Sequence, residues 1–235
     1  AGDGGLNKSG LGTLFLNGVN TYTNTTLVTA GTLGGNGTFT GPVTIQAGAT
    51  LAPGAGLGTF TVNNNLALAG NVAVDVNRSL SPSNDLVVVT GTLNNTGVGS
   101  VTVANLGPTL SIGDSFTLFS KPVANGNALS VLTSGGAIWT NKLAVDGSIQ
   151  VVGLASPPFV PPGSAVRLPD GNISLTATGV VGAVYRLWAS TNVALTPVTN
   201  TWTLLSSGTV GTTPFTIKDL GATNFSQRYY IFSSP

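Results

Sequence analysis

Aspartate is the only acidic residue type in this 235-residue sequence, and two of its seven aspartates are the first candidates for chemistry. Asp75 and Asp85 lie close together in the sequence, and Asn84 directly precedes the second. Carboxylate and amide oxygens are the ligands that hard cations take in proteins, so these residues could contribute to a calcium site. No Asp-x-Asp or nonapeptide calcium repeat is present. An isolated Asp before a strand usually caps a turn, and we favour that structural role.

Four residue types that carry much of enzyme chemistry are absent, namely His, Cys, Met and Glu. Their absence excludes a Ser-His-Asp triad, a thiol nucleophile, an imidazole proton shuttle and a zinc site of the usual ligands. A polysaccharide-degrading enzyme with paired Asp carboxylates is left, and it would need two Asp within about 10 Å across a cleft. We therefore expect no catalytic, cofactor-binding or metal-binding residues, and a protein that is not an enzyme.

Two tryptophans are the candidates for ligand binding. Exposed Trp188 and Trp202 could form a flat aromatic platform on which sugar rings stack, which makes them possible glycan contacts. Trp188 alternates with Tyr185 and Leu187 along one expected strand, so one set should face the core; packing is the favoured interpretation. We expect Trp139 to cover the end of the repeat region described below.

The remaining polar candidates have structural alternatives. Arg186 and Arg228 could bind a carboxylated ligand, but each lies in a β-rich run where a salt bridge or a solvated face is commoner. Asn63, the first residue of "NNN", could join a ladder of stacked amides. Lys8-Ser9 precede a glycine-rich stretch, yet the spacing does not match a phosphate-binding loop and no helix is expected after it. The glycines there are better explained as turn residues.

Composition predicts an all-β protein. Charged residues make up only 6% of the chain, and Thr, Asn, Ser and Gly stand in their place. Val, Thr and Gly suit strands and turns, whereas the favoured helix formers are scarce. The net charge is +1, and the eight Lys and Arg are spread singly, which argues against a nucleic-acid partner. We expect no membrane span, because no apolar run reaches about 20 residues.

Internal similarity indicates a repeat architecture. "GLGTLFLNG" at Gly10 and "GLGTFTVNN" at Gly56 are 46 residues apart, and "TAGTL" (29–33) and "QAGATL" (46–51) form a second, looser pair. Apolar residues alternate with polar ones in short runs that end at Gly or Asn. This pattern is typical of stacked β coils, each of which covers the apolar face of the next. We predict that this continues to residue 153, with residues 98–152 forming the last coils or a cap.

The stretch "GGLNKSGLGTLFLNGVNTYTNTTLVTAGTL" resembles the autotransporter-associated β-strand repeat, and "LAPGAGLGTFTVNNNLAL" and "NDLVVVTGTL" resemble segments that follow such repeats. The resemblance implies a right-handed parallel β-helix, exported to the bacterial surface or beyond. The chain opens on "AGDGG" without Met and enters a repeat with no capping segment before Lys8. We therefore expect it to be a piece of a longer protein, and further repeats in that protein are the alternative to an open end that self-assembles.

A proline-rich segment separates the repeat region from the rest. Residues 154–166 contain "SPPFVPP", which predicts an extended, stiff linker. Five strand candidates follow within residues 167–235, namely "NISLTAT", "AVYRLWAS", "TWTLLSSGT", "PFTIKDL" and "QRYYIFS". Their spacing predicts a small antiparallel β-sandwich. This part resembles C-terminal modules that close large secreted bacterial repeat proteins.

Two classes of function follow. The first is a non-catalytic structural protein of the bacterial surface, which forms or extends a stalk, fibre or matrix by head-to-tail self-assembly of open β-helix ends. The second is an adhesin or carbohydrate-binding module in which the β-helix is a spacer and surface polysaccharide is the partner. Exposure of Trp188 or Trp202 in a shallow groove would favour the second class.

Overall fold

The computed structural model describes residues 2–133, 136–154, 156–180 and 183–233, and it is all-β. The chain divides into two compact units, unit 1 (Ala1–Leu154) and unit 2 (Ala155–Pro235). The described helices are short: α1 (Val198–Thr201) and the 3-10 helices η1 (Gly126–Ala128) and η2 (Ala222–Asn224). No described helix is long and apolar enough to cross a membrane.

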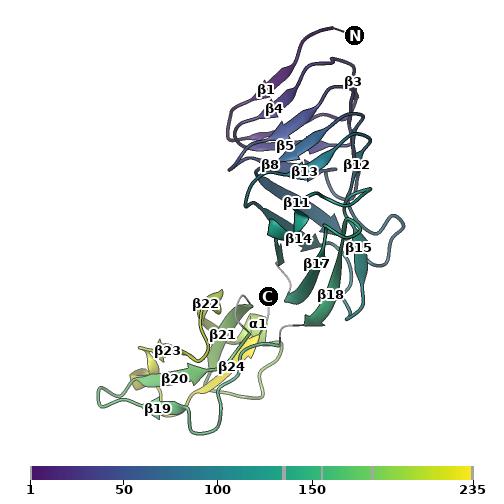
Figure 1. The fold of residues 1–235 in the computed structure, drawn as a ribbon. Coiled ribbons are helices and arrows are strands. Elements are labelled where there is room, and N and C mark those ends of the chain that lie inside the picture. Colours follow the sequence, from purple (N-terminus) through teal and green to yellow (C-terminus); the bar gives the residue numbers. More distant parts are fainter. Residues whose placement is uncertain (1, 134–135, 155, 181–182, 234–235) are drawn as a thin grey trace. The chain divides into compact units, whose positions relative to one another are not determined.

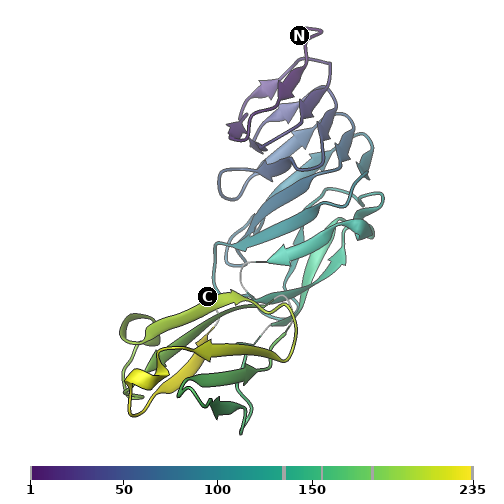
Figure 2. The same ribbon diagram turned by 90° about the vertical axis from the view of Figure 1, so that its left-hand side faces the viewer.

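Unit 1 consists mainly of three parallel sheets whose strands are stacked on one another (Figures 1 and 2). Sheet A holds β1 (Leu6–Lys8), β4 (Thr26–Val28), β7 (Val43–Ile45), β10 (Leu66–Leu68) and β13 (Leu93–Asn95). Sheet B holds β2 (Thr13–Phe15), β5 (Thr32–Gly35), β8 (Thr50–Pro53), β11 (Asn71–Val76), β14 (Ser100–Asn105) and β16 (Ser130–Thr133). Sheet C holds β3 (Val19–Asn20), β6 (Thr38–Phe39), β9 (Thr59–Val62) and β12 (Leu86–Val89).

Consecutive strands visit the three sheets in turn, so β1–β3, β4–β6, β7–β9 and β10–β12 are four successive triplets. Each strand pairs in parallel with the strand of the same sheet in the next triplet, an arrangement compatible with a β-helix. Thr13 pairs with Thr32, 19 residues later, whereas Ser100 pairs with Ser130, 30 residues later. The triplets therefore lengthen along the chain.

The 46-residue repeat does not describe this stacking. Its first copy leads into β2 of sheet B and its second into β9 of sheet C, so the two copies never pair. The looser pair is the structural one, because Thr32 pairs with Thr50 and Leu33 with Leu51. The two copies are alike because each is a glycine turn that leads into a strand, and such a turn can precede a strand of any sheet.

Alternation along each strand sends one side chain in two to the interior, where aliphatic side chains and phenylalanines form one core. Phe39 and Phe60 stack there with ring centroids 4.7 Å apart. Glycine makes one corner between sheets A and B, since Gly31 and Gly48 in successive triplets adopt φ values of 69° and 85°. These left-handed values bear out the interpretation of glycines as turn residues.

The end of unit 1 departs from the parallel pattern. Phe119 continues sheet C by bridging to Val87, and Ala124 continues sheet A by bridging to Asn94. Three further strands form an antiparallel sheet in the order β15-β18-β17, with β15 at Ser115–Thr117, β17 at Ala137–Lys142 and β18 at Ser148–Leu154. Residues 98–152 thus include both continuing parallel strands and an added antiparallel sheet.

Unit 2 contains two three-stranded antiparallel sheets. One has the order β19-β20-β23, with β19 at Ala165–Arg167, β20 at Ile173–Ala177 and β23 at Phe215–Asp219. The other has the order β22-β21-β24, with β22 at Thr203–Thr209, β21 at Val184–Ser190 and β24 at Tyr229–Ser233. Tyr185, Phe215 and Phe232 pack together from both sheets, with centroids 5.2 to 6.2 Å apart. The five strands predicted for this part are confirmed as β20 to β24.

The segment predicted to be a linker contacts unit 2. Phe159 and Thr178 exchange two backbone hydrogen bonds of 3.0 and 2.9 Å, and the Thr176 N–H donates to the Ser164 carbonyl. β19 begins at Ala165, inside the predicted linker range. Backbone pairing therefore includes part of the proline-rich segment in unit 2, although its composition is typical of a spacer.

Candidate functional site

In the described part of the chain, the first triplet forms a free sheet edge, because β1, β2 and β3 each pair on one side only, with β4, β5 and β6. Leu6 N–H donates to the Thr25 carbonyl at 3.2 Å, and the Lys8 carbonyl accepts from Thr29 N–H at 2.8 Å. Successive residues of a strand direct their backbone groups to opposite sides, so the N–H and C=O of Asn7 face the free edge. Such groups can accept another strand.

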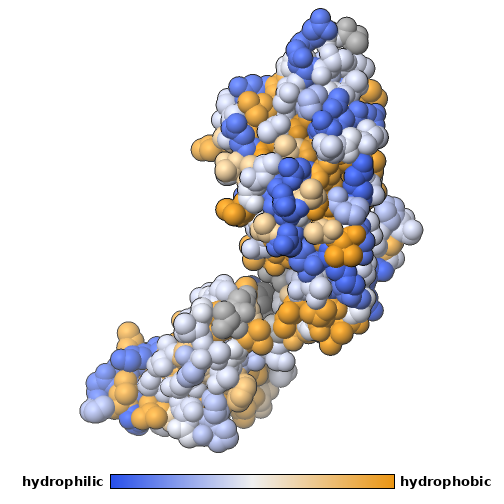
Figure 3. Space-filling model, viewed as in Figure 1, coloured by the Kyte–Doolittle hydropathy of each residue, from blue (hydrophilic) through white to orange (hydrophobic). Residues whose placement is uncertain are grey.

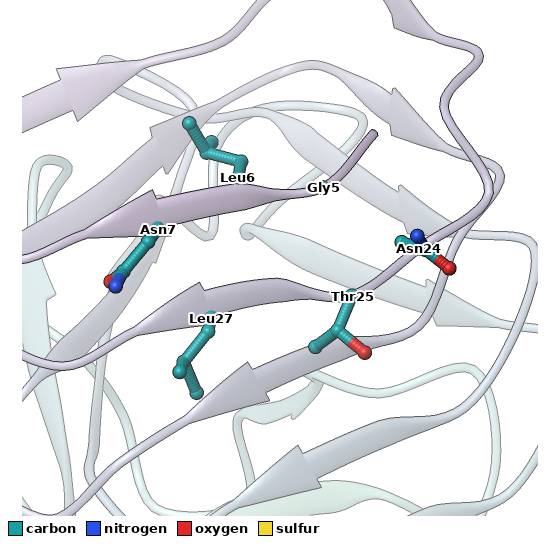
Figure 4. A pocket seen from close by; sticks show the side chains of 6 residues that line it. All are labelled: Gly5, Leu6, Asn7, Asn24, Thr25 and Leu27. Atoms are coloured by element: carbon teal, nitrogen blue, oxygen red, sulfur yellow. The ribbon is translucent and has the colours of Figure 1, made fainter. Parts of the chain in front are cut away.

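A shallow hollow of about 590 Å³ lies along this edge, lined by Gly5, Leu6, Asn7, Asn24, Thr25 and Leu27. Figure 4 shows β1 and β4 side by side, with Asn7 and Leu27 on the same face of sheet A. The lining holds no charged side chain. A backbone edge beside neutral, mostly small side chains is suited to contact with another polypeptide rather than to chemistry.

The other end of the stack is covered. The Asn141 side chain, in β17, donates to the carbonyls of Gly126 and Leu129 at 3.0 and 2.8 Å, which satisfies backbone groups beside β16. Trp139 packs edge-on against Phe116 at 6.0 Å and against the core of unit 1, as expected for a residue that covers the end of the repeats. Its indole N–H is buried and has no partner among the described residues.

Lys8 stabilises a corner of the stack. Its ammonium donates to the carbonyl of Gly10 and, at 3.0 Å, to that of Ala30. Lys121 does the same further along the stack, where it donates to the carbonyls of Thr90 and Gly91 at 3.1 and 2.8 Å. Both lysines use their charge on backbone carbonyls, in agreement with the interpretation that no phosphate-binding loop is present.

Asp85 connects sheets B and C. Its side chain is 1% exposed, and its two oxygens accept from the N–H groups of Gly58 at 2.7 Å and Asp75 at 2.8 Å. The Asp85 N–H in turn donates to the Asp75 carbonyl at 2.9 Å. Burial raises the pKa of Asp85 to about 7, against the two hydrogen bonds that lower it, and burial also raises the pKa of Asp75.

A groove of about 250 Å³ runs over the outer face of sheet B beside these aspartates, with Phe15, Ala52, Thr102 and Ala104 in its lining. No group of three or more His, Cys, Asp or Glu that could hold a metal ion occurs in the described part of the chain. Asp85 is enclosed, with a backbone donor on each oxygen, so its geometry agrees with the structural role favoured from the sequence. A calcium site receives no support.

Asparagine side chains link successive triplets. Asn17 accepts from Asn36 N–H at 3.0 Å, and Asn36 accepts from Thr59 N–H at 3.0 Å. Within the "NNN" stretch that begins at Asn63, the Asn64 side chain donates to the Thr40 carbonyl and the Asn65 side chain accepts from the Thr92 N–H, so these amides bond to backbone groups of neighbouring triplets. Asn17 and Asn36 are 19 residues apart, which is the sheet B spacing between Thr13 and Thr32. That spacing is the signal that could have identified them.

Trp188 and Trp202 are 7% and 8% exposed. The Trp188 indole donates to the Ser233 hydroxyl and the Trp202 indole to the Leu195 carbonyl, both at 2.9 Å. A bulge between Leu187 and Trp188 breaks the expected alternation, which is why both of these neighbours are buried. Neither ring presents the open face that sugar stacking requires, so the predicted glycan contact gains no support and packing is favoured.

Arg228 forms one of the two ion pairs among the described residues, to Asp219 at 3.2 Å. Asp219 is buried, and it also accepts from the Tyr230 hydroxyl at 2.9 Å and the Gly221 N–H at 3.0 Å. Burial, and then the hydrogen bond to Asp219, raises the pKa of Tyr230. Arg186 is half-buried in β21 and belongs to neither ion pair. The salt-bridge alternative is thus confirmed for Arg228, whose partner Asp219 could not be predicted from the sequence.

No protein-family model, no curated protein and no solved structure matches this chain. The resemblance of residues 4–33 to the autotransporter-associated β-strand repeat therefore stays a prediction.

Proposed function

We propose that this chain is a non-catalytic structural module of the bacterial exterior, in which unit 1 extends a stalk, fibre or matrix. In this proposal unit 1 is a right-handed parallel β-helix and unit 2 a small antiparallel β-sandwich. The observation that carries the proposal is the free edge of β1–β3, at one end of a stack of parallel strands. An edge of this kind pairs with further strands, so the stack can be lengthened there.

The composition of the surface supports a structural role. Outward positions of the sheets carry small, uncharged residues such as Thr13, Thr32 and Thr50, which occupy one row of sheet B. Figure 3 shows hydrophilic and hydrophobic side chains interspersed over the visible face of unit 1. Weak charge provides little repulsion between copies, which permits association.

The two ends of the stack differ, and this changes the expected mode of assembly. Asn141 and Trp139 cover the end at β16, so a head-to-tail contact would have to displace the hairpin of β17 and β18. The free edge is therefore better matched to a second free edge. We propose that two copies of the 235-residue chain join through their first triplets, which places two stacks end to end in a closed pair and not in an open filament.

Light scattering over a range of protein concentrations tests this proposal. The chain should shift from the mass of one copy to twice that mass. Asn7→Pro removes an N–H that faces the free edge but none of the bonds to β4, so it should keep the fold and weaken association by about tenfold or more. Asn7→Ala removes the same side chain and keeps the N–H, so it should associate like the wild type. A single-copy mass at every concentration, or association of Asn7→Pro as strong as that of the wild type, would contradict pairing through this edge.

A further inference from the structure

Unit 2 contains a small cavity of about 100 Å³ whose lining includes two arginines. Arg167 comes from β19, Arg228 comes from the segment before β24 together with Phe225 and Gln227, and Tyr230 comes from β24 itself. A cavity of this size admits one small polar group, not a whole sugar ring. The question is which group its walls would favour.

Sheet register places one arginine beside the Asp219 cluster. Arg167 pairs with Ile173, and Ile173 pairs with Asp219, so these three residues form one row across β19, β20 and β23. Residues directly opposite one another in a sheet project to the same face. Arg167 and the buried Asp219 therefore share a face, and Lys218, the neighbour of Asp219 in β23, projects to the other face.

Arg228 is held rigidly at the cavity. Its side chain is only 10% exposed, and its guanidinium lies 4.3 Å from the centre of the Phe225 ring. Its hydrogen bonds to described residues run from one nitrogen, Nη1, to Asp219. A guanidinium carries five N–H donors. The other nitrogens are not among the buried, unpartnered atoms of the described residues, so their N–H donors are open to solvent.

The charged side chains in the lining of the cavity are both cationic. Asp219 offsets Arg228, and its oxygens already accept from Tyr230 and Gly221. Arg167 takes part in neither ion pair of the described residues. The nearby Asp170 accepts from the backbone and side chain of Asn172, each at 3.0 Å. Asp170 keeps its charge, but neither it nor Asp219 lines the cavity, where Arg167 and Arg228 are the charged side chains.

We propose that this cavity is an anion-binding site that takes a single carboxylate group, such as that of an acidic sugar in a surface polysaccharide. Arginine pairs with planar oxyanions through parallel N–H bonds, and the stacked, partly buried Arg228 is already oriented for such a pair. Arg167 would supply the second cation. The assignment does not rest on the structural role proposed above, and it moves the glycan contact from the tryptophans to these arginines. Sulfate and phosphate groups share this chemistry.

An NMR titration of the whole chain tests the assignment, with the arginine Nε–H signals as the readout. Glucuronate should shift the signals of Arg167 and Arg228 in a saturable manner, and glucose should not. Arg167→Gln should weaken glucuronate binding by about tenfold, the effect of removing one charged hydrogen-bond donor. Lys218→Gln removes the same charge on the opposite face of the same sheet, so it should leave the affinity within about twofold.

Three results would overturn the assignment. Equal losses in Arg167→Gln and Lys218→Gln would mean that only net charge matters. Shifts with glucose of the same size would show that the anionic group is not recognised. Tighter binding of sulfate than of glucuronate would overturn the choice of a carboxylate and assign the cavity to tetrahedral oxyanions. Far-UV circular dichroism of both variants establishes that the folds are intact.

Discussion

The two units satisfy the hydrogen-bonding groups of their polar atoms in different ways. In unit 1 like residues often pair along the stack, as with Thr13, Thr32 and Thr50, and the corners are held by amides, lysines and Asp85 bonded to backbone groups. In unit 2 the pairing residues are unlike, for example Tyr185 opposite Gly208, and a buried ion pair joins β23 to the segment before β24.

This difference has a physical origin. In parallel stacking, equivalent positions of successive triplets lie in one row. The same hydrogen bond from a side chain to the backbone of the next triplet can therefore recur along the stack. Antiparallel sheets provide no such repetition. In unit 2 a single charged cluster, with a cavity beside it, takes the place of repeated contacts. Stability in unit 1 should therefore depend on repeated small contributions, and in unit 2 on a few individual contacts.

The largest effect is expected in the core of unit 1. Phe60→Ala removes a ring that is buried and stacked on Phe39, and it should lower the free energy of unfolding by about 4 kcal/mol. Phe15→Ala is the matched control, because Phe15 is 49% exposed on sheet B and should cost less than about 1 kcal/mol. Urea unfolding followed by hydrogen exchange of unit 1 measures both. Equal costs would show that the phenylalanine stack is not part of a tightly packed core.

The second effect concerns the corner at Asp85. Asp85→Ala leaves the buried N–H groups of Gly58 and Asp75 without acceptors, which should cost about 3 kcal/mol. Asp3→Ala changes an exposed residue of the same type in the same unit and should cost less than about 0.5 kcal/mol. Thermal or urea unfolding of the two variants compares them. A cost below about 1 kcal/mol for Asp85→Ala would contradict the role of this carboxylate in joining sheets B and C.

The same residue predicts a pH dependence. The pKa of Asp85 is raised from 3.8 to about 7 on folding, so between these values the folded state binds more protons than the unfolded state. The free energy of unfolding should therefore fall as the pH rises from about 4 to about 7, by at most about 1.4 kcal/mol per pH unit, and then level off. Asp85→Asn cannot titrate and should lose the part of this slope that Asp85 contributes, while Asp75, whose pKa burial also raises, keeps its own part. Parallel pH profiles of wild type and variant would refute the assignment to Asp85.

The smallest effect concerns the charged cluster of unit 2. Tyr230→Phe removes one donor to the buried Asp219 and should cost about 1 kcal/mol, confined to unit 2. Tyr229→Phe removes the hydroxyl of the more exposed neighbour and should be close to neutral. Hydrogen exchange resolved by segment distinguishes the units. A loss of hydrogen-exchange protection in sheets A to C would contradict the prediction that the effect is confined to unit 2.

Local patterns in the sequence predict the elements better than they predict their partners. The alternation of Val72, Val74 and Val76 predicts β11 and its buried face, and the five strands of unit 2 follow from the same rule. Which strands pair with one another is harder to predict from the sequence. The strong similarity of residues 10 and 56 onward marks two turn–strand junctions in different sheets, while the weaker one at residues 29 and 46 marks true neighbours. Variable triplet length hides the register.

The candidate sites show the same division. Asp85 and Arg228 could be singled out by type, but their partners Gly58 and Asp219 come from distant segments that only tertiary pairing brings near. The bulge at Trp188 lies in the pairing of β21 with β22, so alternation alone gave the wrong side for part of β21. The free edge at β1 becomes visible only when the strands are assigned to sheets.

Pairing of two copies through that edge is the claim most directly open to measurement. The chain has no cysteine, so Asn7→Cys and Thr44→Cys each introduce a unique thiol. Asn7 and Thr44 occupy the same row of sheet A, at its free edge and in its interior respectively. With a short thiol crosslinker, the variant with cysteine at position 7 should form covalent dimers at concentrations where the variant at position 44 does not. Equal crosslinking of the two, or none at position 7, would contradict the account.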